Sequence, residues 1–556
     1  MATSAHDAVT LQQLMNASSS DALRLQLSKM VQGADNSDAI RHTAFQKLRL
    51  DSRDVNLNDV FVLLKSHSQH CPKSRDYLLQ ASEQAAFILS EMDPVALFDN
   101  TNMPYDSNIE LKDTPLNNAQ STARKQPLAP LSALSCPILY VPNIRDFLGD
   151  LIQARLQYQQ SVTLPTVVAV TGTNAKTTIS QLVAQLAQLA NMSSAVMGTA
   201  GNGKLGALVP ASHTTGDALA VQQFLYQMGE QKADLLALEA SSHGLDQQRL
   251  QGVPVKIAIY TNLSRDHLDY HADMSDYVAA KARLFDKAHF PTLTHAIINE
   301  DDEYAQVMLD TAQASGLIVW TYSLVASSDA TFVAAEIEPS LQGVDITLRS
   351  EFGDMNIVSP LLGRFNVANL LAAMAAAVAL GISLQSIADL VPQLQGAIGR
   401  MQRVPSNDGC FIVDYAHTPD ALTQVLNSLK THCDGQLWAV FGCGGDRDAG
   451  KRPLMAQAGL LGADQVVLTA DNPRSEDPNV ILQDMQVGMS PEQYQRTHIE
   501  PARQKAIEYA VRHADTNDIV VIAGKGHETY QEINGVRHDF DDSIILQQAL
   551  KQTKRL

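Results

Sequence analysis

Short apolar runs alternate with helical patterns through most of the chain after residue 137. The run TVVAV at 166–170 is apolar and rich in β-branched residues, which predicts a buried strand. After a short polar loop, apolar residues recur at the spacing of one helix face: Ile179, Leu182, Val183, Leu186 and Leu189. Further elements are predicted as strands at 235–238, 257–260 and 296–298 and as an alanine-rich helix at 367–380. Strands that alternate with helices predict an α/β fold with a parallel sheet.

The regions on either side of this central part predict two further α/β domains. Strands are predicted at 411–413, 437–441, 465–469 and 519–523. Near the start, residues 1–45 are predicted as a polar helix or tail, followed by strand-like runs at 48–55 and 59–66. Residues 94–135 are rich in Asn, Pro, Ser and Asp without periodicity, which predicts a loop insertion. We therefore expect three domains, at 1–144, 145–397 and 398–556.

Composition narrows the class of protein. Of 556 residues, 45% are hydrophobic and 18% charged, which is ordinary for a globular chain. The net charge of −19 disfavours nucleic acid and anionic membranes as partners, so an anionic substrate needs local cations or a metal. The apolar window 370–380 is shorter than the ~20 residues of a membrane span. Five cysteines without a CxxC spacing fit a reducing compartment, and a cytoplasmic protein without membrane insertion is expected.

The loop between the strand at 166–170 and the next helix has the composition of a phosphate-binding loop. Its sequence is TGTNAKTT at 171–178, and its backbone N–H groups, with Lys176, could surround phosphates. Thr177 is placed to hold Mg²⁺. The pattern departs from the strict motif because Val170 and Ala175 stand where glycines are expected. An ordinary strand-to-helix turn is the alternative interpretation.

Three further side chains after central strands could contribute chemistry. Glu239 ends a predicted strand, where open α/β sheets bind ligands, and its carboxylate could hold a metal ion. His267 follows another strand, and Lys281 lies on a predicted helix. A solvated acid, a structural histidine and a surface lysine are the alternatives for these three residues.

Three loops of the last domain carry charge together with glycine or proline. They are GCGGDRD at 442–448, DNPR at 471–474 and GKGHE at 524–528. In a doubly wound sheet, these loops would converge on the carboxyl edge. Arg447 and Arg474 suit carboxylates, whereas Asp471 and Glu528 suit ammonium groups. The combination predicts an amino-acid pocket, and surface ion pairs around tight turns are the alternative.

The ordered set of motifs resembles the Mur ligases of bacterial cell-wall synthesis. The motifs are GTNAKTT, EASSHGL, TNLSRDHLDYH, the helix of Lys281, GRFNVANLLAA, GRM, DYAHTPDAL, GCGGDRD, DNPR and GKGHE. The resemblance covers about 45–95 and 137–556. It implies an N-terminal UDP-binding domain, a central P-loop-type ATPase domain and a C-terminal Rossmann-like domain. The activity it implies is ATP-dependent amide-bond formation through an acyl phosphate, in a monomer.

The resemblance also implies roles for residues around ATP and Mg²⁺. ATP would be bound by Gly172, Thr173, Asn174, Ala175, Lys176, Thr177, Thr178, Asn366, Asn369, Arg400 and Asp414. Thr177 and Glu239 would hold one Mg²⁺, and Glu239, His267 and a carbamylated Lys281 a second. Lys176, Glu239, His267 and Lys281 would be the catalytic residues. Ala175 replaces a glycine that this family usually has, so a left-handed backbone at this position would be unfavourable for alanine.

The implied substrates are UDP-N-acetylmuramoyl-L-Ala-D-Glu and an amino acid. The nucleotide-sugar peptide would contact Leu50, Ser52, His67, Thr214, Thr215, Ser241, Gln247 and Arg249. The amino acid would contact Arg447, Asp471, Asn472, Pro473, Arg474, Gly524 and Glu528. DNPR is the family's pattern for meso-diaminopimelate, because Arg474 could bind a second carboxylate that lysine lacks. The alternatives are an L-lysine-adding ligase, a catalytically silent protein that binds muropeptide precursors and a folylpolyglutamate-type ligase.

Overall fold

The computed structural model describes residues 8–18, 20–31, 37–66, 73–99, 130–211 and 213–556. The chain forms two compact units. The first comprises residues up to Thr163 with 216–227 and 247–253, and the second comprises 164–215, 228–246 and 254–556. The α/β class predicted from the sequence is confirmed, because each large sheet is mainly parallel and is covered by helices.

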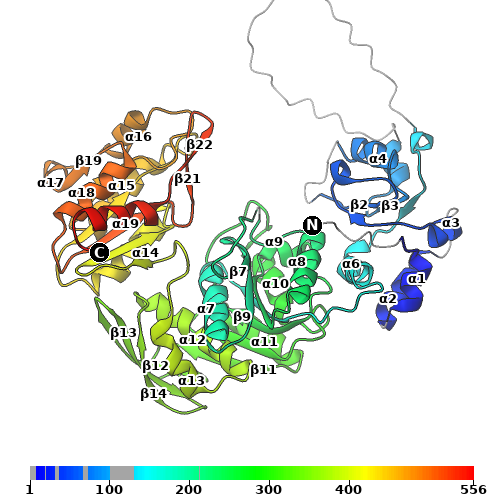
Figure 1. The fold of residues 1–556 in the computed structure, drawn as a ribbon, viewed down its shortest axis with the longest axis horizontal. Helices are drawn as coiled ribbons and strands as arrows, with labels where there is room; N and C mark the ends of the chain where they lie inside the picture. The colour runs from blue at the N-terminus through cyan, green and yellow to red at the C-terminus, as the bar shows by residue number, and fades with distance from the viewer. Residues whose placement is uncertain (1–7, 19, 32–36, 67–72, 100–129, 212) are drawn as a thin grey trace, which may run out of the picture. The chain divides into compact units, whose positions relative to one another are not determined.

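The first unit contains a four-stranded parallel sheet in the order β1-β2-β3-β4 (Figure 1). Its strands are β1 (Leu48–Arg49), β2 (Val60–Leu63), β3 (Phe87–Ser90) and β4 (Ile138–Tyr140). Its helices are α1 (Leu11–Ala17), α2 (Asp21–Met30), α3 (Ser37–His42), α4 (Ser74–Ser82), α5 (Pro94–Phe98) and α6 (Leu148–Leu156). The predicted insertion at 94–135 therefore begins with a helix, and its residues 100–129 lie outside the described residues.

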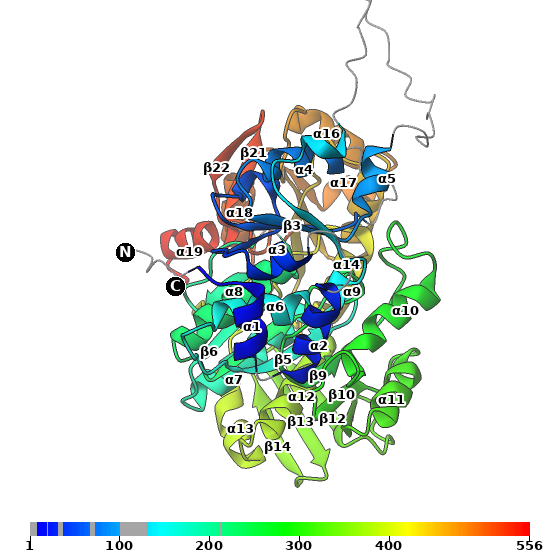
Figure 2. The same ribbon diagram turned by 90° about the vertical axis from the view of Figure 1, so that its right-hand side faces the viewer.

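Most of the described residues among the first 45 lie in the three helices α1, α2 and α3 rather than in a tail. Helices α1 and α2 pack against each other (Figures 1 and 2), and each begins at a side-chain cap, Thr10 or Ser20. Leu11, Leu14 and Leu27 belong to the same buried cluster as β2 and β3. The apolar residues of these helices are separated by polar stretches in the sequence, but they share one buried face that completes the core of the first unit.

The second unit contains a ten-stranded sheet in the order β14-β13-β12-β11-β10-β9-β5-β8-β6-β7. Its strands are β5 (Thr166–Thr171), β6 (Ser194–Gly198), β7 (Gly201–Lys204), β8 (Leu235–Glu239), β9 (Val255–Tyr260), β10 (His295–Asn299), β11 (Ile318–Ser323), β12 (Phe332–Ser340), β13 (Gly343–Ser350) and β14 (Met355–Ser359). The strands from β11 through β6 are parallel, whereas β12, β13 and β14 form an antiparallel extension. The strands predicted at 166–170, 235–238, 257–260 and 296–298 are confirmed as β5, β8, β9 and β10.

Helices that follow the strands cover this sheet. They are α7 (Lys176–Leu189), α9 (Ser242–Asp246), α10 (Met274–Ala282), α11 (Ala305–Ala314), α12 (Arg364–Ala379) and α13 (Leu384–Leu390). Helix α8 (Ala218–Glu230) lies mostly in the first unit. Val168 and Val170 of β5 share a buried core with Leu182 of α7 and Leu371 of α12. Helix α12, predicted at 367–380, is buried nearly all round, which explains its alanine-rich sequence.

A six-stranded sheet in the order β15-β16-β20-β17-β18-β19 lies in the C-terminal part of the second unit. Its strands are β15 (Gln402–Val404), β16 (Cys410–Asp414), β17 (Leu437–Phe441), β18 (Gln465–Leu468), β19 (Thr497–Ile499) and β20 (Ile519–Ala523), and a hairpin adds β21 (Tyr530–Ile533) and β22 (Val536–Asp539). Its helices are α14 (Pro419–Lys430), α15 (Lys451–Gly462), α16 (Pro478–Met485), α17 (Pro491–Gln495), α18 (Arg503–His513) and α19 (Asp542–Gln552). The four strands predicted here are confirmed as β16, β17, β18 and β20.

Alternate residues of these strands pack on two separate cores. Ala439 and Val521 belong to the core under α14, α15 and α16. Val440 and Val520 belong to the core under α18 and α19. Helices therefore cover both faces of this parallel sheet, which is the doubly wound arrangement expected from its sequence.

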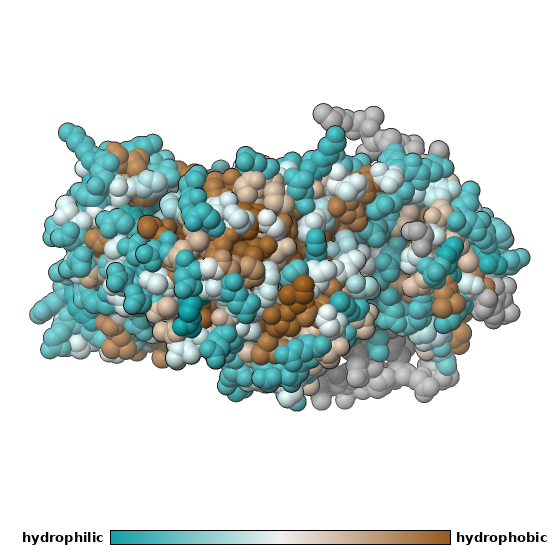
Figure 3. All heavy atoms as spheres, turned by 90° about the horizontal axis from the view of Figure 1, so that it is seen from below, coloured by the Kyte–Doolittle hydropathy of each residue, from teal (hydrophilic) through white to brown (hydrophobic). Residues whose placement is uncertain are grey.

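The surface carries both hydrophilic and apolar regions. Figure 3 shows hydrophilic residues over much of one face, with apolar patches between them. Among the described residues, no helix is both long enough and apolar enough to cross a membrane. The domain boundaries at 144 and 397 remain predictions.

Candidate active site

The carboxyl ends of β9, β5 and β8 lie next to one another in the central sheet. The loop after β5 is bound to the loop after β9 through backbone and side-chain hydrogen bonds. Asn262 accepts hydrogen bonds from the N–H of Thr173 (2.8 Å, backbone carbonyl) and from the N–H of Asn174 (3.0 Å, Oδ1). The Thr261 hydroxyl donates to the carbonyl of Asn174 over 2.7 Å. Residues 171–178 therefore form a fixed loop between a strand and the N-terminus of α7, as phosphate binding requires.

Ala175 occupies a left-handed backbone conformation at the N-cap of α7, with φ 70° and ψ −3°. An alanine in this region costs about 1–2 kcal/mol, because its Cβ approaches the following carbonyl oxygen. The sequence-based concern about the missing glycine is therefore confirmed at the level of the backbone. The strained residue immediately precedes Lys176.

Two lysines meet at a single carbonyl of this loop. Nζ of Lys176 lies 2.7 Å and Nζ of Lys281 lies 2.8 Å from the carbonyl oxygen of Gly172. Lys281 is only 1% exposed, and its ammonium lies 4.6 Å from the ring centre of Tyr277. The surface-lysine alternative is thus excluded for Lys281. Burial, with repulsion from Lys176, holds the pKa of Lys281 well below its usual value.

Glu239 lies at the end of β8 and is surrounded by hydroxyl and backbone donors. Its Oε1 accepts from the Thr177 hydroxyl over 2.9 Å and from the N–H of Thr199 over 2.8 Å. Burial raises the pKa of Glu239, and the charge of Lys176 together with these hydrogen bonds opposes the rise. Gly198 makes room for this carboxylate, because a Cβ there would lie 2.1 Å from Oε1. The solvated-acid alternative is therefore excluded for Glu239.

Thr199 is a site residue that the sequence did not reveal. It follows β6, and its hydroxyl contacts both Glu239 Oε2 and Thr214 Oγ1 at 3.1 Å. Its only sequence signal is its position directly after a strand, which by itself does not indicate that the strand neighbours β8. Thr215 binds the backbone of the same residue, because its hydroxyl donates to the carbonyl oxygen of Glu239 over 2.7 Å.

His267 belongs to a cluster of rings beside Lys281. Its ring centre lies 4.9 Å from that of His243 and 5.9 Å from that of Tyr277. Burial, with the nearby cations Lys176 and Lys281, lowers the pKa of His267, although Asp266 opposes the shift. Within the described part of the chain, no group of three or more His, Cys, Asp or Glu side chains could hold a metal ion. The predicted metal residues instead form two contacts, Thr177 with Glu239, and Lys281 with His267 through Tyr277.

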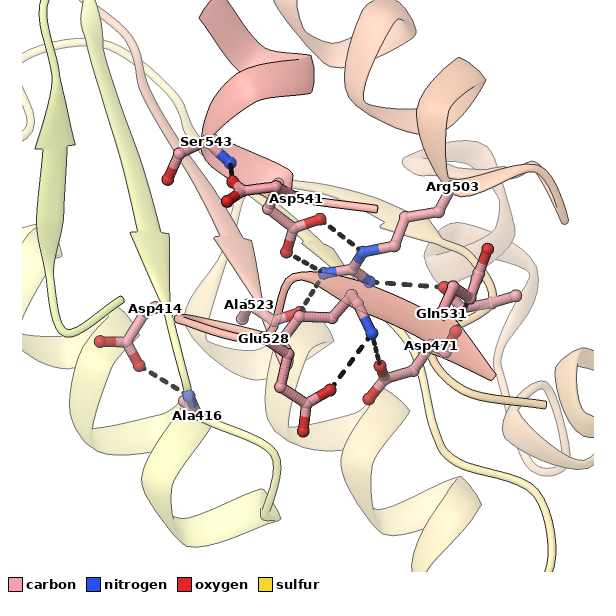
Figure 4. Close-up of polar contacts among 12 residues, drawn as sticks. Asp414, Ala416, Asp471, Arg503, Ala523, Glu528, Gln531, Asp541 and Ser543 are labelled. Atoms are coloured by element: carbon pink, nitrogen blue, oxygen red, sulfur yellow. Dashed lines mark hydrogen bonds and ion pairs between the residues drawn. The ribbon is translucent and has the colours of Figure 1, made fainter. Parts of the chain in front are cut away.

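Three of the residues expected around the rest of ATP, Asn366, Asn369 and Asp414, are buried and hydrogen-bonded. Asn366 and Asn369 lie in the first turns of α12, and Nδ2 of Asn369 donates to Oδ1 of Asn366 over 3.0 Å. The carboxylate of Asp414 accepts from the N–H groups of Met401 and Ala416, each over 2.7 Å. The contact with Ala416 appears in Figure 4. Arg400 lies over the ring of Tyr415, 4.6 Å from its centre.

The expected amino-acid residues come together at the carboxyl edge of the C-terminal sheet. Nδ2 of Asn472 donates to Oε2 of Glu528 over 3.0 Å. Nζ of Lys525, fully buried, lies 3.2 Å from Oε2 of Glu528 and 3.5 Å from Oδ1 of Asp471. Figure 4 shows the carboxylates of Asp471 and Glu528 turned toward the same point. Lys525 is the second residue that sequence reasoning missed, although its motif GKGHE had been singled out.

The remaining residues expected to bind the amino acid lie in the same three loops. The guanidinium of Arg474 donates to the carbonyl of Gly445 over 2.7 Å and lies 3.8 Å from Glu532. Pro473 packs so closely on Gly445 that a Cβ there would lie 1.9 Å from the Pro473 carbonyl oxygen. Gly524 has φ 120°, and Arg447 is exposed in the loop after β17. The predicted convergence of the 442–448, 471–474 and 524–528 loops is therefore present in the structure.

The residues expected to bind the nucleotide-sugar peptide are divided between the units. Leu50, Ser52, Gln247 and Arg249 lie in the first unit, and Thr214, Thr215 and Ser241 lie in the second. Ser52 is buried and donates to Oε1 of Gln80 over 2.9 Å. Arg249 donates to Oε1 of Gln247 over 2.8 Å. His67 lies outside the described residues.

Comparison with protein families gives two matches that together cover most of the second unit. Residues 170–377 match the Mur ligase middle domain. Residues 399–526 match the Mur ligase glutamate ligase domain. The two matched segments contain the phosphate loop, Lys176 and Lys281, the loops at 442–448 and 471–474, and the first three residues of the 524–528 loop.

Individual relatives extend the similarity to nearly the whole chain. The UDP-N-acetylmuramoyl-L-alanyl-D-glutamate--2,6-diaminopimelate ligase of Vibrio vulnificus is 39% identical over 91% of this chain and 94% of its own length. The enzyme of the same name from Pseudomonas aeruginosa is 47% identical over 69% of this chain and 77% of its own length.

Solved structures give the same result at the level of the fold. A structure of a UDP-N-acetylmuramoyl-L-alanyl-D-glutamate--2,6-diaminopimelate ligase covers 99% of this chain and 100% of its own, with a TM-score of 0.70 and 41% identity. A folylpolyglutamate synthase of Mycobacterium tuberculosis, complexed with ADP and AMPPCP, covers 69% of this chain and 92% of its own, with a TM-score of 0.53. At 18% identity, it shares the fold alone.

Proposed function

This chain belongs to the Mur ligase family, and from that premise we propose that it joins meso-diaminopimelate to UDP-N-acetylmuramoyl-L-alanyl-D-glutamate. The new amide bond forms at the γ-carboxylate of the D-glutamate, and ATP is converted to ADP and phosphate. The reaction belongs to peptidoglycan precursor synthesis, as the names of the relatives indicate. Because it consumes ATP and a nucleotide-activated sugar, we place it in the cytoplasm, and the monomeric state remains a prediction.

The observation that carries this proposal is the pair of lysines at the phosphate loop. Lys176 and the buried Lys281 both contact the carbonyl of Gly172, beside the Thr177–Glu239 pair. A carboxylate that attacks a triphosphate brings two anions together, so the site needs positive charge where the phosphoryl group is transferred, which Lys176 and a metal ion held beside it would supply. A lysine on a helix that served only solubility would not be buried against such a loop.

The chemistry proceeds in two balanced steps. In the first, the γ-carboxylate oxygen of D-glutamate bonds to the γ-phosphorus of ATP, the bond to the β-phosphate oxygen breaks and ADP leaves. In the second, the amine of the incoming amino acid bonds to the acyl carbon, the bond to phosphate breaks and the ammonium proton is lost. Lys176 would bind the phosphates, and the Asp471–Glu528 carboxylates would hold an ammonium group of the amino acid.

Mg²⁺ fits part of the donor set at this site. The Thr177 hydroxyl and the buried Glu239 carboxylate are oxygen donors in contact with each other, as Mg²⁺ prefers. When bound with ATP, Mg²⁺ would neutralise charge on the phosphates. Lys281 as an ammonium would repel a cation, whereas a carbamate on the same nitrogen would be an oxygen ligand. The lowered pKa of Lys281 favours the neutral amine, whose nitrogen can bond to the carbon of CO₂ with loss of a proton.

Replacement of Lys281 tests this site. In Lys281→Ala, we expect substrate-dependent phosphate release to fall by at least a hundredfold, because the carbamate that would hold the metal cannot form. Phosphate release with ATP, Mg²⁺ and both substrates measures the loss. Lys551→Ala, an exposed helix lysine, is the matched control and should retain full activity. Undiminished turnover in Lys281→Ala would contradict the proposed carbamate.

One observation favours a different function. Ala175 places a strained residue in the phosphate loop, which is consistent with a catalytically silent protein that binds the precursor. The buried Glu239 and Lys281 argue against it, because a protein that only binds the precursor has no use for a metal site. The silent protein would bind the nucleotide substrate without releasing phosphate, so a measurement of phosphate release distinguishes it from the ligase.

A further inference from the structure

Lys525 is a buried ammonium group that the proposed chemistry does not use. It follows Gly524 in the loop after β20, and its side chain is 0% exposed. Both flanking glycines, at 524 and 526, have positive φ angles of 120° and 54°, so the loop turns sharply on each side of the lysine. This backbone points the lysine inward, beneath the edge of the sheet where the amino-acid residues converge.

Its contacts are with residues of the proposed amino-acid site. Nζ of Lys525 donates to Oδ1 of Asn472 over 3.0 Å and to Oε2 of Glu528 over 3.2 Å. It also forms an ion pair with Oδ1 of Asp471 at 3.5 Å. The ammonium group of Lys525 thus makes two hydrogen bonds and one longer ion pair.

The charge of Lys525 has a physical consequence for the two acids. Asp471 is only 9% exposed, and the side chain of Glu528 is 22% exposed. Two carboxylates this close in a partly buried place would repel each other and move apart. The ammonium between them removes that repulsion. It also holds Asn472, whose own amide donates to Glu528.

A second ion pair, which is fully buried, holds the first residues of the 471–474 and 524–528 loops. Arg503 and Asp542 are 0% exposed and lie 2.7 Å apart. The guanidinium also donates to the carbonyl of Ala523 over 3.0 Å and contacts that of Ala470 at 3.4 Å. These carbonyls precede the GKGHE and DNPR loops, and Figure 4 shows Arg503 between Ala523 and the Asp541 loop. The start of each loop is thus fixed, which leaves the side chains at 471, 472 and 528 to be placed.

One carboxylate oxygen of the proposed amino-acid site accepts no hydrogen bond. Oδ1 of Asp471 is buried and has no hydrogen-bond partner among the described residues. It lies at ion-pair distance from Lys525 and can still accept a hydrogen bond. An incoming ammonium group would therefore meet a carboxylate that is already oriented and only partly neutralised.

From this arrangement, which rests on the proposed function, we propose that Lys525 is a positioning residue for the amino-acid step. It acts through Asp471, Asn472 and Glu528 by holding them in their binding arrangement before the amino acid arrives. A site arranged in advance avoids the cost of ordering side chains when the ligand binds. Lys525 therefore sets the affinity for the amino acid and leaves the affinities for ATP and the nucleotide sugar unchanged.

The test compares the KM values of three substrates in Lys525→Met and Lys525→Gln. In Lys525→Met, we expect the KM for meso-diaminopimelate to rise at least tenfold, because both carboxylates lose their common cation. The KM values for ATP and for UDP-N-acetylmuramoyl-L-alanyl-D-glutamate should stay within twofold. Lys525→Gln keeps a neutral donor for Asn472 and should fall between the wild type and Lys525→Met. Lys505→Met, an exposed lysine of the same domain, should change none of the three values.

A double variant shows whether Lys525 acts through Glu528. If it does, Lys525→Met combined with Glu528→Gln should raise the KM for the amino acid by less than the product of the two single effects. Full multiplication of the single effects would overturn the proposal. So would an unchanged amino-acid KM in Lys525→Met, or a common rise for all three substrates, which a merely structural lysine would produce. If Lys525→Met does not fold, Lys525→Gln decides the question.

Failure of the proposed function would be recognised separately. The wild-type protein must release phosphate in response to meso-diaminopimelate before any variant is compared. If the wild type shows no such activity, the proposed function fails, whatever the behaviour of Lys525. If the wild type is active and the amino-acid KM of Lys525→Met is unchanged, only the positioning role fails.

Discussion

At the scale of single residues, Ala175 is a strained position in an otherwise well-supported loop. Its φ of 70° lies where L-residues other than glycine, asparagine and aspartate are seldom found. The neighbouring residues Thr173 and Asn174 are held by hydrogen bonds to the loop after β9, so they prevent the backbone from relaxing. The strain is therefore imposed by the surrounding structure.

Glycine at this position should relieve the strain. We expect Ala175→Gly to stabilise the protein by about 1 kcal/mol, because the Cβ contact disappears while the backbone keeps its conformation. The midpoint of thermal unfolding should rise by about 1 °C in a calorimetric scan, because the unfolding entropy of so large a unit is high. Ala190→Gly is the matched control. Ala190 ends the same helix with φ −84°, so glycine there should lower the midpoint. A lower midpoint in Ala175→Gly would contradict this interpretation.

Sequence reasoning found the residues that carry distinctive chemistry and missed those that support them. Glu239 and Lys281 lie in recognisable motifs, and the structure places both beside the phosphate loop. Thr199 and Lys525 were missed because a threonine after a strand and a lysine between glycines are common. Their importance comes from which strands are neighbours and which way a loop turns, and neither property is local in sequence.

At the scale of elements, His432 joins helix α14 to the region around the start of α12. Its Nε2 accepts from the N–H of Gly363 over 2.9 Å, and its Nδ1 lies 2.8 Å from the carbonyl of Ser340. The N–H at one nitrogen and the carbonyl at the other require a neutral ring protonated on Nδ1. Burial lowers the pKa of His432, although the carbonyls of Ser340 and Gly343 oppose the shift.

This histidine predicts a dependence of stability on pH. Because its pKa in the folded state lies below its unfolded value of 6.5, its contribution is complete above pH 6.5 and is lost as the pH falls below that value. His432→Gln cannot gain a proton. The difference in free energy of unfolding between wild type and His432→Gln should therefore be larger at pH 7.5 than at pH 5.5, as measured by urea unfolding. An equal difference at both pH values would show that His432 does not titrate in this way.

The buried pair of Arg503 and Asp542 ties α18 to α19 and to two strand ends. Arg503→Met alone should cost about 3–5 kcal/mol, because it leaves Asp542 as an unpaired buried charge. Adding Asp542→Leu should recover part of this loss, with a coupling energy above about 1 kcal/mol. Urea unfolding of the four proteins measures the cycle. Arg512→Met, an exposed arginine of the same helix, serves as the control. Additive effects would show that the pair is not coupled.

The helices and strands were predicted most accurately where apolar runs are long. The central strands and α12 were located from their apolar patterns alone. Before Phe45, the sequence does not distinguish a helix from a tail, because the apolar residues are few and separated by polar stretches. The antiparallel extension formed by β12, β13 and β14 was not predicted, since its strands expose many polar side chains.

At the scale of the whole molecule, the net negative charge opposes the binding of the anionic substrates. The chain carries a net charge of −19, yet Lys176 lies at the phosphate loop beside Thr177 and Glu239, the proposed Mg²⁺ ligands. A negative protein binds a triphosphate and a nucleotide sugar only where cations are placed locally. The C-terminal site combines Arg474 and Lys525 with Asp471 and Glu528, as suits an amino acid that carries charges of both signs.

The most direct test is phosphate release from ATP in the presence of Mg²⁺ and UDP-N-acetylmuramoyl-L-alanyl-D-glutamate, with meso-diaminopimelate or L-lysine as the amino acid. We predict release with meso-diaminopimelate and at least a hundredfold less with L-lysine, because lysine would leave Arg474 without its carboxylate. Release with L-lysine at a similar rate would contradict the assignment of the amino acid. Release with neither, while the nucleotide substrate still binds, would contradict the ligase and favour a silent precursor-binding protein.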